Sequence, residues 1–277
     1  RSTKKNHTQL LRICKKVLLG CYNIDPSTNS CSVSRRHILT TYSLLCPTRS
    51  RATRAVDFAE SAIRTAKHPE RLELLFYLDD NDPELQSYYR GMDALKGRLV
   101  GTGNIQITEG PEIGVPRATN VLANKSKSEI IMYTSDDQVY IDHGWDSRLD
   151  KEVAKYPDRI FCIWFNDGWE SEKFCTFPIV SRQWIETLGY FLFPFFEHFF
   201  TDTWIWMLAK SVDRAIYIPD VLIEHRHWKI GKSEKDETYE RNATSNGDSR
   251  HARDRAVIDQ FERYFLADVK LLQNSIR

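Results

Sequence analysis

The feature that most constrains the fold is a regular alternation between short apolar runs and longer amphipathic segments. The apolar runs have the length and composition of buried strands, and the segments between them repeat apolar residues every three or four positions, as helices do. This alternation is typical of an α/β protein with a mixed, mostly parallel sheet flanked by helices. The expected strands are 38–46, 72–78, 98–108, 130–133, 159–165, 177–180 and 215–224, and the expected helices are 52–66, one opening at 114–120, 145–155, 202–212 and 255–272.

Length and charge indicate one main domain with a distinct N-terminal arm. A chain of 277 residues with 41% apolar residues can bury one large core, and 39 basic residues against 38 acidic ones leave no overall field that favours a polyanion or a membrane. Residues 1–36 differ, because they hold eight basic residues and a single acid, Asp25. We therefore expect a basic, partly helical arm at 1–36, a main domain at 37–230, and a mobile polar loop with a C-terminal helix at 231–277; the loop is expected over the polar stretch 229–253.

The chain shows no sign of a membrane span or of a cysteine-bound metal. No apolar run approaches the roughly 20 residues that a spanning helix needs. The six cysteines form no CxxC pair and have no zinc-finger spacing with histidine. A cytoplasmic protein with reduced thiols is therefore expected.

Acidic residues follow two of the expected strands. Asp136 and Asp137 come just after the apolar strand 130–133, and a second acidic run begins at Asp79, after strand 72–78. Ligands of open α/β sheets bind at the carboxyl ends of the strands, so both groups of acids are expected at the binding edge. Adjacent carboxylates repel each other unless a cation lies nearby, although a solvated acid pair at a strand end is the plainer alternative.

Six short motifs occur in an order that resembles the GT-A glycosyltransferases of family two, which are inverting, metal-dependent enzymes that use nucleotide sugars. The motifs are Cys-Pro-Thr-Arg-Ser at 46–50, Leu-Asp-Asp at 78–80, Gly-Val-Pro-Arg-Ala-Thr-Asn at 114–120, Ser-Asp-Asp at 135–137, Thr-Asp-Thr at 201–203 and Glu-His-Arg-His at 224–227. The resemblance covers residues 37–230, which would be the GT-A catalytic domain, and similar arrangements occur in virus-encoded transferases. One departure is Ser135, which stands where the family's Asp-x-Asp motif has its first acid.

The resemblance implies a divalent ion, Mn²⁺ or Mg²⁺, bound at Asp137. His225 or His227 would supply a further ligand, and His225 is favoured because the family's histidine follows the last strand directly. Asp136 would reach the ribose or the metal. Carboxylate oxygens suit such an ion and leave positions open for the phosphates of the donor. A satisfied surface pair is the alternative for the two histidines.

The same resemblance assigns a nucleotide-sugar donor, expected to be a UDP-sugar, to the ends of the first two strands and the start of the helix at 114–120. The residues expected there are Pro47, Thr48 and Arg49 beside the base, Asp79 or Asp80 as acceptors from the base imide or ribose, and Arg117 near the base or a phosphate. Ordinary turn and capping chemistry is the alternative for these residues.

Inverting transfer needs one base to take the proton from the acceptor hydroxyl. Asp202 occupies the base position of the family, and Glu197 and His198 are the reserve candidates. The alternative is a helix N-cap at Thr201 or Asp202, and both roles can hold together.

The acceptor is less constrained than the donor. A basic strip in residues 1–36 would follow a phosphate backbone, which leads us to expect a hydroxymethylated base in DNA as the acceptor; a solvated basic face or a disordered tail is the alternative. Two other functions compete with a transferase. A sugar-phosphate nucleotidyltransferase normally has a glycine-rich basic loop after its first strand, which residues 47–51 lack, and an inactive transferase-like module would bind a polyanion through residues 1–36.

Overall fold

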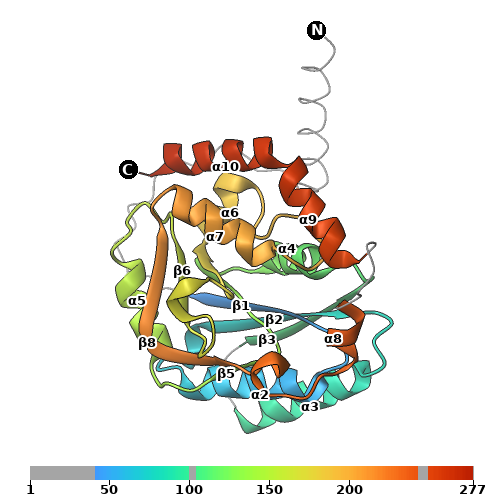
Figure 1. The fold of residues 1–277 in the computed structure, drawn as a ribbon. Helices are drawn as coiled ribbons and strands as arrows, with labels where there is room; N and C mark the ends of the chain where they lie inside the picture. Colours follow the sequence, from blue (N-terminus) through green and yellow to red (C-terminus); the bar gives the residue numbers. More distant parts are fainter. Residues whose placement is uncertain (1–40, 100–103, 243–248, 277) are drawn as a thin grey trace, which may run out of the picture. The chain divides into compact units, whose positions relative to one another are not determined.

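Eight strands form one mixed sheet in the computed structural model, which describes residues 41–99, 104–242 and 249–276 (Figure 1). The strands are β1 (Tyr42–Thr48), β2 (Leu72–Asp79), β3 (Asn104–Gly110), β4 (Ile130–Tyr133), β5 (Gln138–Tyr140), β6 (Cys162–Asn166), β7 (Ile179–Ser181) and β8 (Ala215–His225). Their order is β3-β2-β1-β4-β7-β6-β8-β5. The pairs β1/β2, β1/β4, β2/β3 and β6/β8 are parallel, whereas β7 runs antiparallel to β4 and β6, and β5 antiparallel to β8. The predicted fold class, a mixed and mostly parallel sheet flanked by helices, is confirmed.

Helices cover both faces of the sheet (Figure 1). They are α2 (Ala52–Thr65), α3 (Leu85–Arg98), α4 (Val115–Lys125), α5 (Trp145–Val153), α6 (Arg182–Leu188), α7 (Thr201–Ser211), α8 (Glu237–Asn242), α9 (Arg250–Gln260) and α10 (Glu262–Ser275). Alternate residues of a strand point to opposite faces, so Leu44 packs in the core under α2, α3 and α5, and Leu45 packs in the core under α4, α6 and α7. None of the helices in the described ranges is long and apolar enough to cross a bilayer.

Several elements differ from those that the sequence predicts. The strand β5 and the helices α3 and α6 were not expected; β5 has only three residues and α6 only seven, too few for a clear period. The expected helix 255–272 is two helices that meet at Phe261. The expected basic arm, 1–36, lies outside the described residues.

The expectation of a loop over 229–253 is wrong for α8 and for the start of α9, which are helical. The sequences of α8 and of the first turn of α9 are polar apart from Tyr239 and Ala252, so no apolar stripe reveals them. Further along α9, Val257 and Ile258 pack against the core. Ser249 caps α9 by accepting a hydrogen bond from the amide of Ala252. At α8, Asp236 and Tyr239 form hydrogen bonds with residues of the site described below.

The order of the strands places a crevice between β1 and β4. The chain runs outward from β1 to β2 and β3, then returns to the other side of β1 with β4. At such a switch point the loops after two adjacent parallel strands turn toward opposite faces and leave a binding crevice between them. The segment 49–51 follows β1 and the acid pair in 135–137 follows β4. The acid pair therefore lies where an open α/β sheet binds its ligands.

Gly114 fixes the start of α4 against the loop before α7. Its φ of +80° and ψ of 157° lie in a region that is essentially restricted to glycine. A Cβ at this position would lie 2.7 Å from the carbonyl oxygen of Glu197, and that carbonyl accepts a hydrogen bond from the amide of Val115. The absent side chain thus allows α4 and the loop to meet backbone to backbone.

We expect Gly114→Ala to lower the free energy of unfolding by about 1–3 kcal/mol, because the new Cβ strains the backbone and meets Glu197. Chemical denaturation measures this change. Gly97→Ala is the matched control, since no atom lies within 4 Å of its added Cβ and a helical alanine is the better helix former. Unchanged stability of Gly114→Ala would contradict the close contact.

Candidate active site

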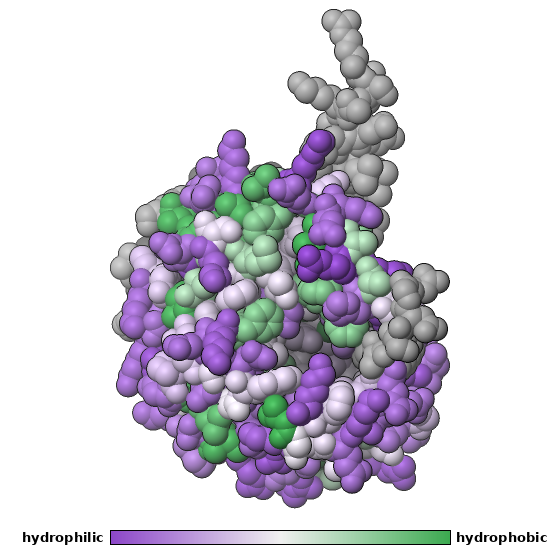
Figure 2. Space-filling view, in the orientation of Figure 1, coloured by the Kyte–Doolittle hydropathy of each residue, from purple (hydrophilic) through white to green (hydrophobic). Residues whose placement is uncertain are grey.

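Two adjoining cavities open at the crevice between β1 and β4. The larger, of about 460 Å³, lies between the start of α7, the end of β8 and α8, and the smaller, of about 140 Å³, lies between the ends of β1 and β2 and the start of α4. Figure 2 shows a mostly hydrophilic face that is hollowed near its centre. The residues shared by both cavities are Arg51, Tyr133, Ser135, His198 and Thr238. One continuous site therefore has room for two substrate parts side by side.

Asp136 is held by two residues that follow or end β1. Its carboxylate is buried, its Oδ1 accepts a hydrogen bond from Arg51 Nη1 at 3.0 Å, and its Oδ2 accepts one from Thr48 Oγ1 at 2.5 Å. Burial raises the pKa of Asp136 to about 6, although the charge of Arg51 acts in the opposite direction. Asp136 thus borders the smaller cavity, but both of its oxygens already have protein donors, whereas the sequence predicted a contact to ribose or metal.

Arg51 connects the acid pair to the segment that contains α8. Its Nε and Nη2 donate to the two carboxylate oxygens of Asp236, each at 2.8 Å, and its guanidinium lies 4.3 Å from the centre of the Tyr239 ring. Tyr239 in turn donates its hydroxyl to Asp137 Oδ2 at 2.8 Å. One buried cation therefore holds both strand ends and the C-terminal segment together.

The pairing of β5 with β8 brings Asp137 beside His225. Gln138, the next residue after Asp137, lies opposite His225 in the antiparallel ladder, and the amide of Arg226 donates to the carbonyl of Asp137 at 2.8 Å. His225 Nε2 lies 3.4 Å from Asp137 Oδ2. Burial acts to raise the pKa of Asp137, but the hydrogen bond and charge of His225 hold it below its ordinary value. This carboxylate is therefore ionised in the folded protein.

The pair of Asp137 and His225 fits a divalent ion that takes further ligands from elsewhere. Asp137 Oδ1 is buried and has no hydrogen-bond partner, which leaves a strong acceptor available to a cation. In the described ranges no group of three or more His, Cys, Asp or Glu side chains is arranged to hold a metal by itself. An ion at this pair would thus take further oxygens from phosphates, as Mg²⁺ and Mn²⁺ commonly do.

His227 does not complete such a group. Its Nδ1 accepts a hydrogen bond from the amide of Lys229 at 3.2 Å, and its ring centre lies 4.9 Å from that of Trp169. Burial and the charge of His225 lower the pKa of His227 to about 4, so its ring is neutral. Of the two predicted histidines, only His225 lies beside Asp137.

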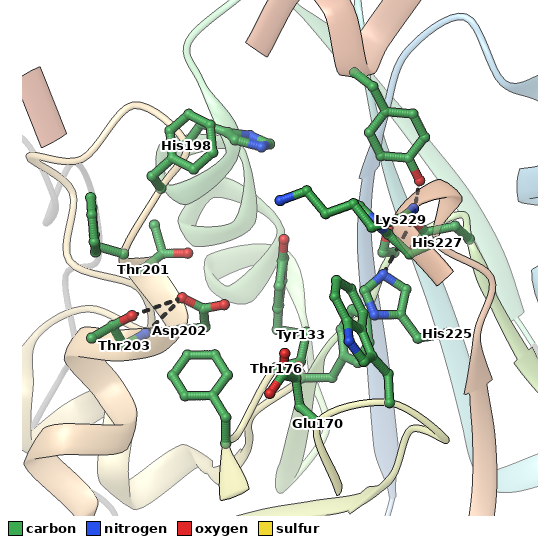
Figure 3. A pocket seen from close by; sticks show the side chains of 18 of the residues that line it. Tyr133, Glu170, Thr176, His198, Thr201, Asp202, Thr203, His225, His227 and Lys229 are labelled. Atoms are coloured by element: carbon green, nitrogen blue, oxygen red, sulfur yellow. Dashed lines mark hydrogen bonds and ion pairs between the residues drawn. The ribbon is translucent and has the colours of Figure 1, made fainter. Parts of the chain in front are cut away.

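Asp202 lies in the first turn of α7. Figure 3 shows its carboxylate directed into the larger cavity, with His225 and His227 on the other side of the view. Its Oδ1 accepts hydrogen bonds from the amide of Thr203 at 2.7 Å and from the Thr203 hydroxyl at 3.4 Å. The N-cap of α7 is Phe200, with φ of +63°, and no side chain caps the helix, so the alternative role of Asp202 as an N-cap does not occur.

Burial raises the pKa of Asp202 to about 6, against the hydrogen bonds from Thr203 that lower it. A carboxylate with this pKa is mostly ionised at neutral pH and is a stronger base than an ordinary aspartate. Of the reserve candidates, Glu197 is ion-paired with Arg253 at 2.8 Å, and burial lowers the pKa of His198 to about 4. Of these three candidates, Asp202 is the carboxylate that lines the larger cavity without an ion-pair partner among the described residues.

A buried carboxylate of α9 fixes the loop that leads to Asp202. Asp254 is 1% exposed and accepts hydrogen bonds from three successive amides, those of residues 197, 198 and 199, at 2.7, 2.9 and 2.7 Å. Together with the contact at Gly114, this arrangement holds the loop on two sides. The start of α7 is therefore set by helices from distant parts of the chain.

The predicted donor residues divide into two groups. Pro47, Thr48, Arg49 and Asp79 all line the smaller cavity, and Arg49 Nη1 lies 3.0 Å from Asp79 Oδ2. Asp80 is exposed and lines neither cavity.

Arg117 also lines neither cavity. Its Nε donates to the carbonyl of Ile113 at 2.5 Å and its Nη1 to that of Pro194 at 3.2 Å. Arg117 lies on α4, at a helix start as expected, but its guanidinium joins two backbone segments. In this structure it is a brace between the start of α4 and the loop before α7.

Sequence reasoning missed several residues of the site. Tyr239 and Asp236 lie in the polar stretch that was expected to be a loop, and Arg51 directly follows the motif at 46–50. Aromatic side chains also line the larger cavity. Its tryptophan and phenylalanine residues are Trp169, Phe174, Phe177, Phe199, Phe200 and Trp228.

Solved structures of other proteins are similar to this fold. The mannosyltransferase PcManGT from Pyrobaculum calidifontis, in complex with GDP-Man and Mn²⁺, aligns over 96% of this chain and 81% of its own, with a TM-score of 0.54 and 14% identity. S. aureus TarS 1–349 in complex with UDP-GlcNAc aligns over 86% and 82%, with a TM-score of 0.52 and 9% identity.

A further structure of S. aureus TarS aligns over 66% of this chain with a TM-score of 0.51 and 9% identity, and there the chain spans only 36% of the TarS chain. Identities at this level show a shared fold alone. No protein-family model matches the chain, and no curated protein matches it.

We expect Arg51→Met to lower the free energy of unfolding by about 3–5 kcal/mol, because it leaves Asp136 buried without its counter-charge. Arg64→Met, on the helix α2 that follows Arg51, is the control, since Arg64 makes an exposed pair with Glu60 that contributes about 0.5 kcal/mol or less. Urea unfolding of both variants measures the difference. Equal losses of unfolding free energy in the two variants would show that the buried pair of Arg51 and Asp136 stabilises the fold no more than an exposed pair does.

Proposed function

We propose that this chain, which has the GT-A fold of glycosyltransferases, is a metal-dependent inverting glycosyltransferase that moves a sugar from a nucleotide-sugar to a hydroxyl acceptor. The observation that carries the proposal is the pair of Asp137 and His225, which faces the same cavity as the buried base candidate Asp202. The pair suits the phosphate side of a donor, and the base suits the acceptor side. The similar folds solved with GDP-Man and Mn²⁺ and with UDP-GlcNAc support a nucleotide-sugar and a divalent ion in general terms.

The smaller cavity is the proposed nucleotide site. The Asp79 carboxylate would accept a hydrogen bond from a ring N–H of the base, and Arg49, which pairs with it, would hold it in place. Thr48 and Pro47 would bound the base and ribose. We propose a UDP-sugar as the donor; a GDP-sugar is the other arm of the test below.

Asp137 and His225 would hold the ion, Mn²⁺ or Mg²⁺, together with the diphosphate. When bound, such an ion neutralises the negative charge that develops on the leaving diphosphate. The orphaned Asp137 Oδ1 and the neighbouring His225 Nε2 supply the ligands that the chain itself offers. Tyr239 donates a hydrogen bond to Asp137 Oδ2. On ion binding, this hydrogen bond would either keep the carboxylate oriented or be replaced by a contact between Oδ2 and the ion.

Asp202 would take the proton from the acceptor hydroxyl as that oxygen attacks the anomeric carbon. Attack on the face opposite the diphosphate inverts the configuration at that carbon, and Asp202 then holds the proton until solvent removes it. The raised pKa suits this step, because a base works best with a pKa near the working pH. The amide and hydroxyl of Thr203 would orient the carboxylate toward the acceptor.

The acceptor would lie against the aromatic lining of the larger cavity. Trp169, Phe199 and Phe200 offer apolar ring faces, which suit either a sugar ring or a nucleobase. The expectation of a hydroxymethylated base in DNA stays a prediction from residues 1–36, which lie outside the described residues, and the assay below can include such DNA as one acceptor.

Asp137→Asn is expected to abolish donor turnover, because it removes the charge that holds the ion, while circular dichroism stays that of the wild type. The measurement is the release of UDP or GDP from a panel of UDP- and GDP-sugars with Mn²⁺, with and without a chelator. Asp93→Asn, on an exposed side chain of α3, is the control and should leave turnover unchanged.

Full turnover in excess chelator would remove the metal from the mechanism. Mn²⁺-independent binding of a polyanion with no donor turnover would favour the non-catalytic module instead. Release of pyrophosphate from a nucleoside triphosphate would favour a nucleotidyltransferase.

Asp202→Asn is expected to reduce turnover by about 10²–10⁴-fold with nearly unchanged donor affinity, because a positioned base contributes about that much. In the wild type, turnover at saturating Mn²⁺ should fall about tenfold per pH unit below a pH of about 6, where Asp202 becomes protonated and can no longer accept a proton. In the Asp202→Asn variant, turnover should no longer fall in this way below a pH of about 6. Profiles of turnover against pH for the wild type and the variant measure this difference.

Loss of donor binding in Asp202→Asn would instead assign Asp202 to the structure of the site. A product with the anomeric configuration of the donor would contradict inversion.

A further inference from the structure

A second buried carboxylate, Asp167, lies on the far side of His225 from Asp137. Asp167 follows β6 and is 5% exposed. Its Oδ1 accepts hydrogen bonds from the amides of Trp169 and Ser171, both at 2.9 Å, and its Oδ2 accepts one from the Thr176 hydroxyl at 3.3 Å. The carboxylate thus closes a turn, and its Oδ2 also lies 4.0 Å from His225 Nδ1.

The imidazole of His225 is fixed between the two carboxylates. Its Nε2 faces Asp137 at 3.4 Å and its Nδ1 faces Asp167. The ring centres of Trp169 and Phe177 lie 5.4 and 4.9 Å from that of His225, and the backbone amide of His225 donates to the carbonyl of Asp167 at 2.9 Å. Ring and backbone are both held, so the imidazole has little freedom to turn.

The open question at this residue is the position of its proton. His225 is 7% exposed, and its Nδ1 is buried without a hydrogen-bond partner. To bind an ion the imidazole must be neutral, with its proton on one nitrogen and a free lone pair on the other. With Asp137 alone nearby, that carboxylate would draw the proton to Nε2 and the lone pair would point away from the proposed ion.

We propose that Asp167 is a positioning residue that keeps the proton of His225 on Nδ1, so that Nε2 presents its lone pair beside Asp137. This inference rests on the proposed function, because it concerns the ion that Asp137 and His225 would hold. A shift of the Asp167 side chain by less than the length of one bond turns the 4.0 Å approach into a hydrogen bond. Carboxylates in this position commonly fix the tautomer and raise the basicity of metal-binding histidines.

The alternative is that Asp167 only shapes the turn at 167–171. Asp167→Asn separates the two roles. The side-chain oxygen of asparagine still accepts from the amides of Trp169 and Ser171, so the turn is kept. Its NH₂ group, however, would donate a hydrogen bond to Nδ1 and so favour the tautomer that carries the proton on Nε2. In that tautomer Nε2 has no free lone pair for an ion beside Asp137.

The experiment measures Mn²⁺ affinity directly, from the electron paramagnetic resonance signal of free Mn²⁺ in the presence of UDP. We expect Asp167→Asn to weaken Mn²⁺ binding by about 10–100-fold and to leave UDP binding without metal unchanged. Thr176→Val is the matched control, because it removes the hydroxyl that donates to Asp167 Oδ2 but leaves the carboxylate opposite His225; its Mn²⁺ affinity should stay near that of the wild type.

A double-mutant cycle identifies the route of the effect. In a His225→Ala background, Asp167→Asn should cause no further loss of Mn²⁺ affinity, because the residue through which it acts is gone. The same loss in both backgrounds would overturn the inference in favour of a role in the turn. Should the Asp167→Asn protein fail to fold, the nitrogen chemical shifts of His225 in the wild type with Mg²⁺ and UDP decide the matter, and a proton on Nε2 overturns the inference.

The outcomes separate this inference from the proposed function. Wild-type affinity in Asp167→Asn would end the role of Asp167 while the metal site and the transferase proposal stand. No Mn²⁺ binding by the wild type would end the metal part of the proposed function and this inference with it. Weak binding in Asp167→Asn that needs an intact His225 supports both.

Discussion

The buried ion pair between Arg51 and Asp136 is the interaction on which the site depends. A carboxylate at the switch point of the sheet is stable there only with a cation beside it, because an unpaired buried charge costs several kcal/mol. Arg51 supplies that cation from the loop after β1, and the remaining N–H groups of the same guanidinium hold Asp236. The pair therefore joins the loops after β1 and β4 and the C-terminal segment. Without it, the acid pair would repel and the crevice would lose one wall.

This arrangement divides the work of the two adjacent aspartates. Asp136 has protein donors on both oxygens, whereas Asp137 retains a buried oxygen without a partner. The serine at position 135 fits the same division, since its side chain helps to lower the pKa of the neighbouring Asp137 carboxylate. One acid of the pair thus stabilises the crevice, which leaves the other available to a ligand.

The two walls of the larger cavity are fixed by independent sets of contacts. On one wall, Asp254 and Gly114 hold the loop before α7 and so set Asp202. On the other, the β5–β8 ladder and the turn closed by Asp167 set the imidazole of His225. Groups that act on two substrates must keep their separation while each is loaded, and rigid elements on both sides provide this. The geometry is consistent with a donor bound on one side and an acceptor on the other.

The sequence by itself determined the alternating architecture and the placement of acids at strand ends, and it identified Asp137, Asp202 and His225, which line one cavity. It could do so because parallel strands bring their carboxyl ends to one edge, so local patterns there imply proximity. Only the tertiary structure decided which side chains meet across that edge. Arg51 reaches Asp236, 185 positions away, the polar helix α8 covers the site without an apolar pattern to reveal it, and Arg117 turns to backbone carbonyls instead of the cavity. Side-chain direction at turns and pairing between remote segments depend on the packed whole, and no local period in a sequence records them.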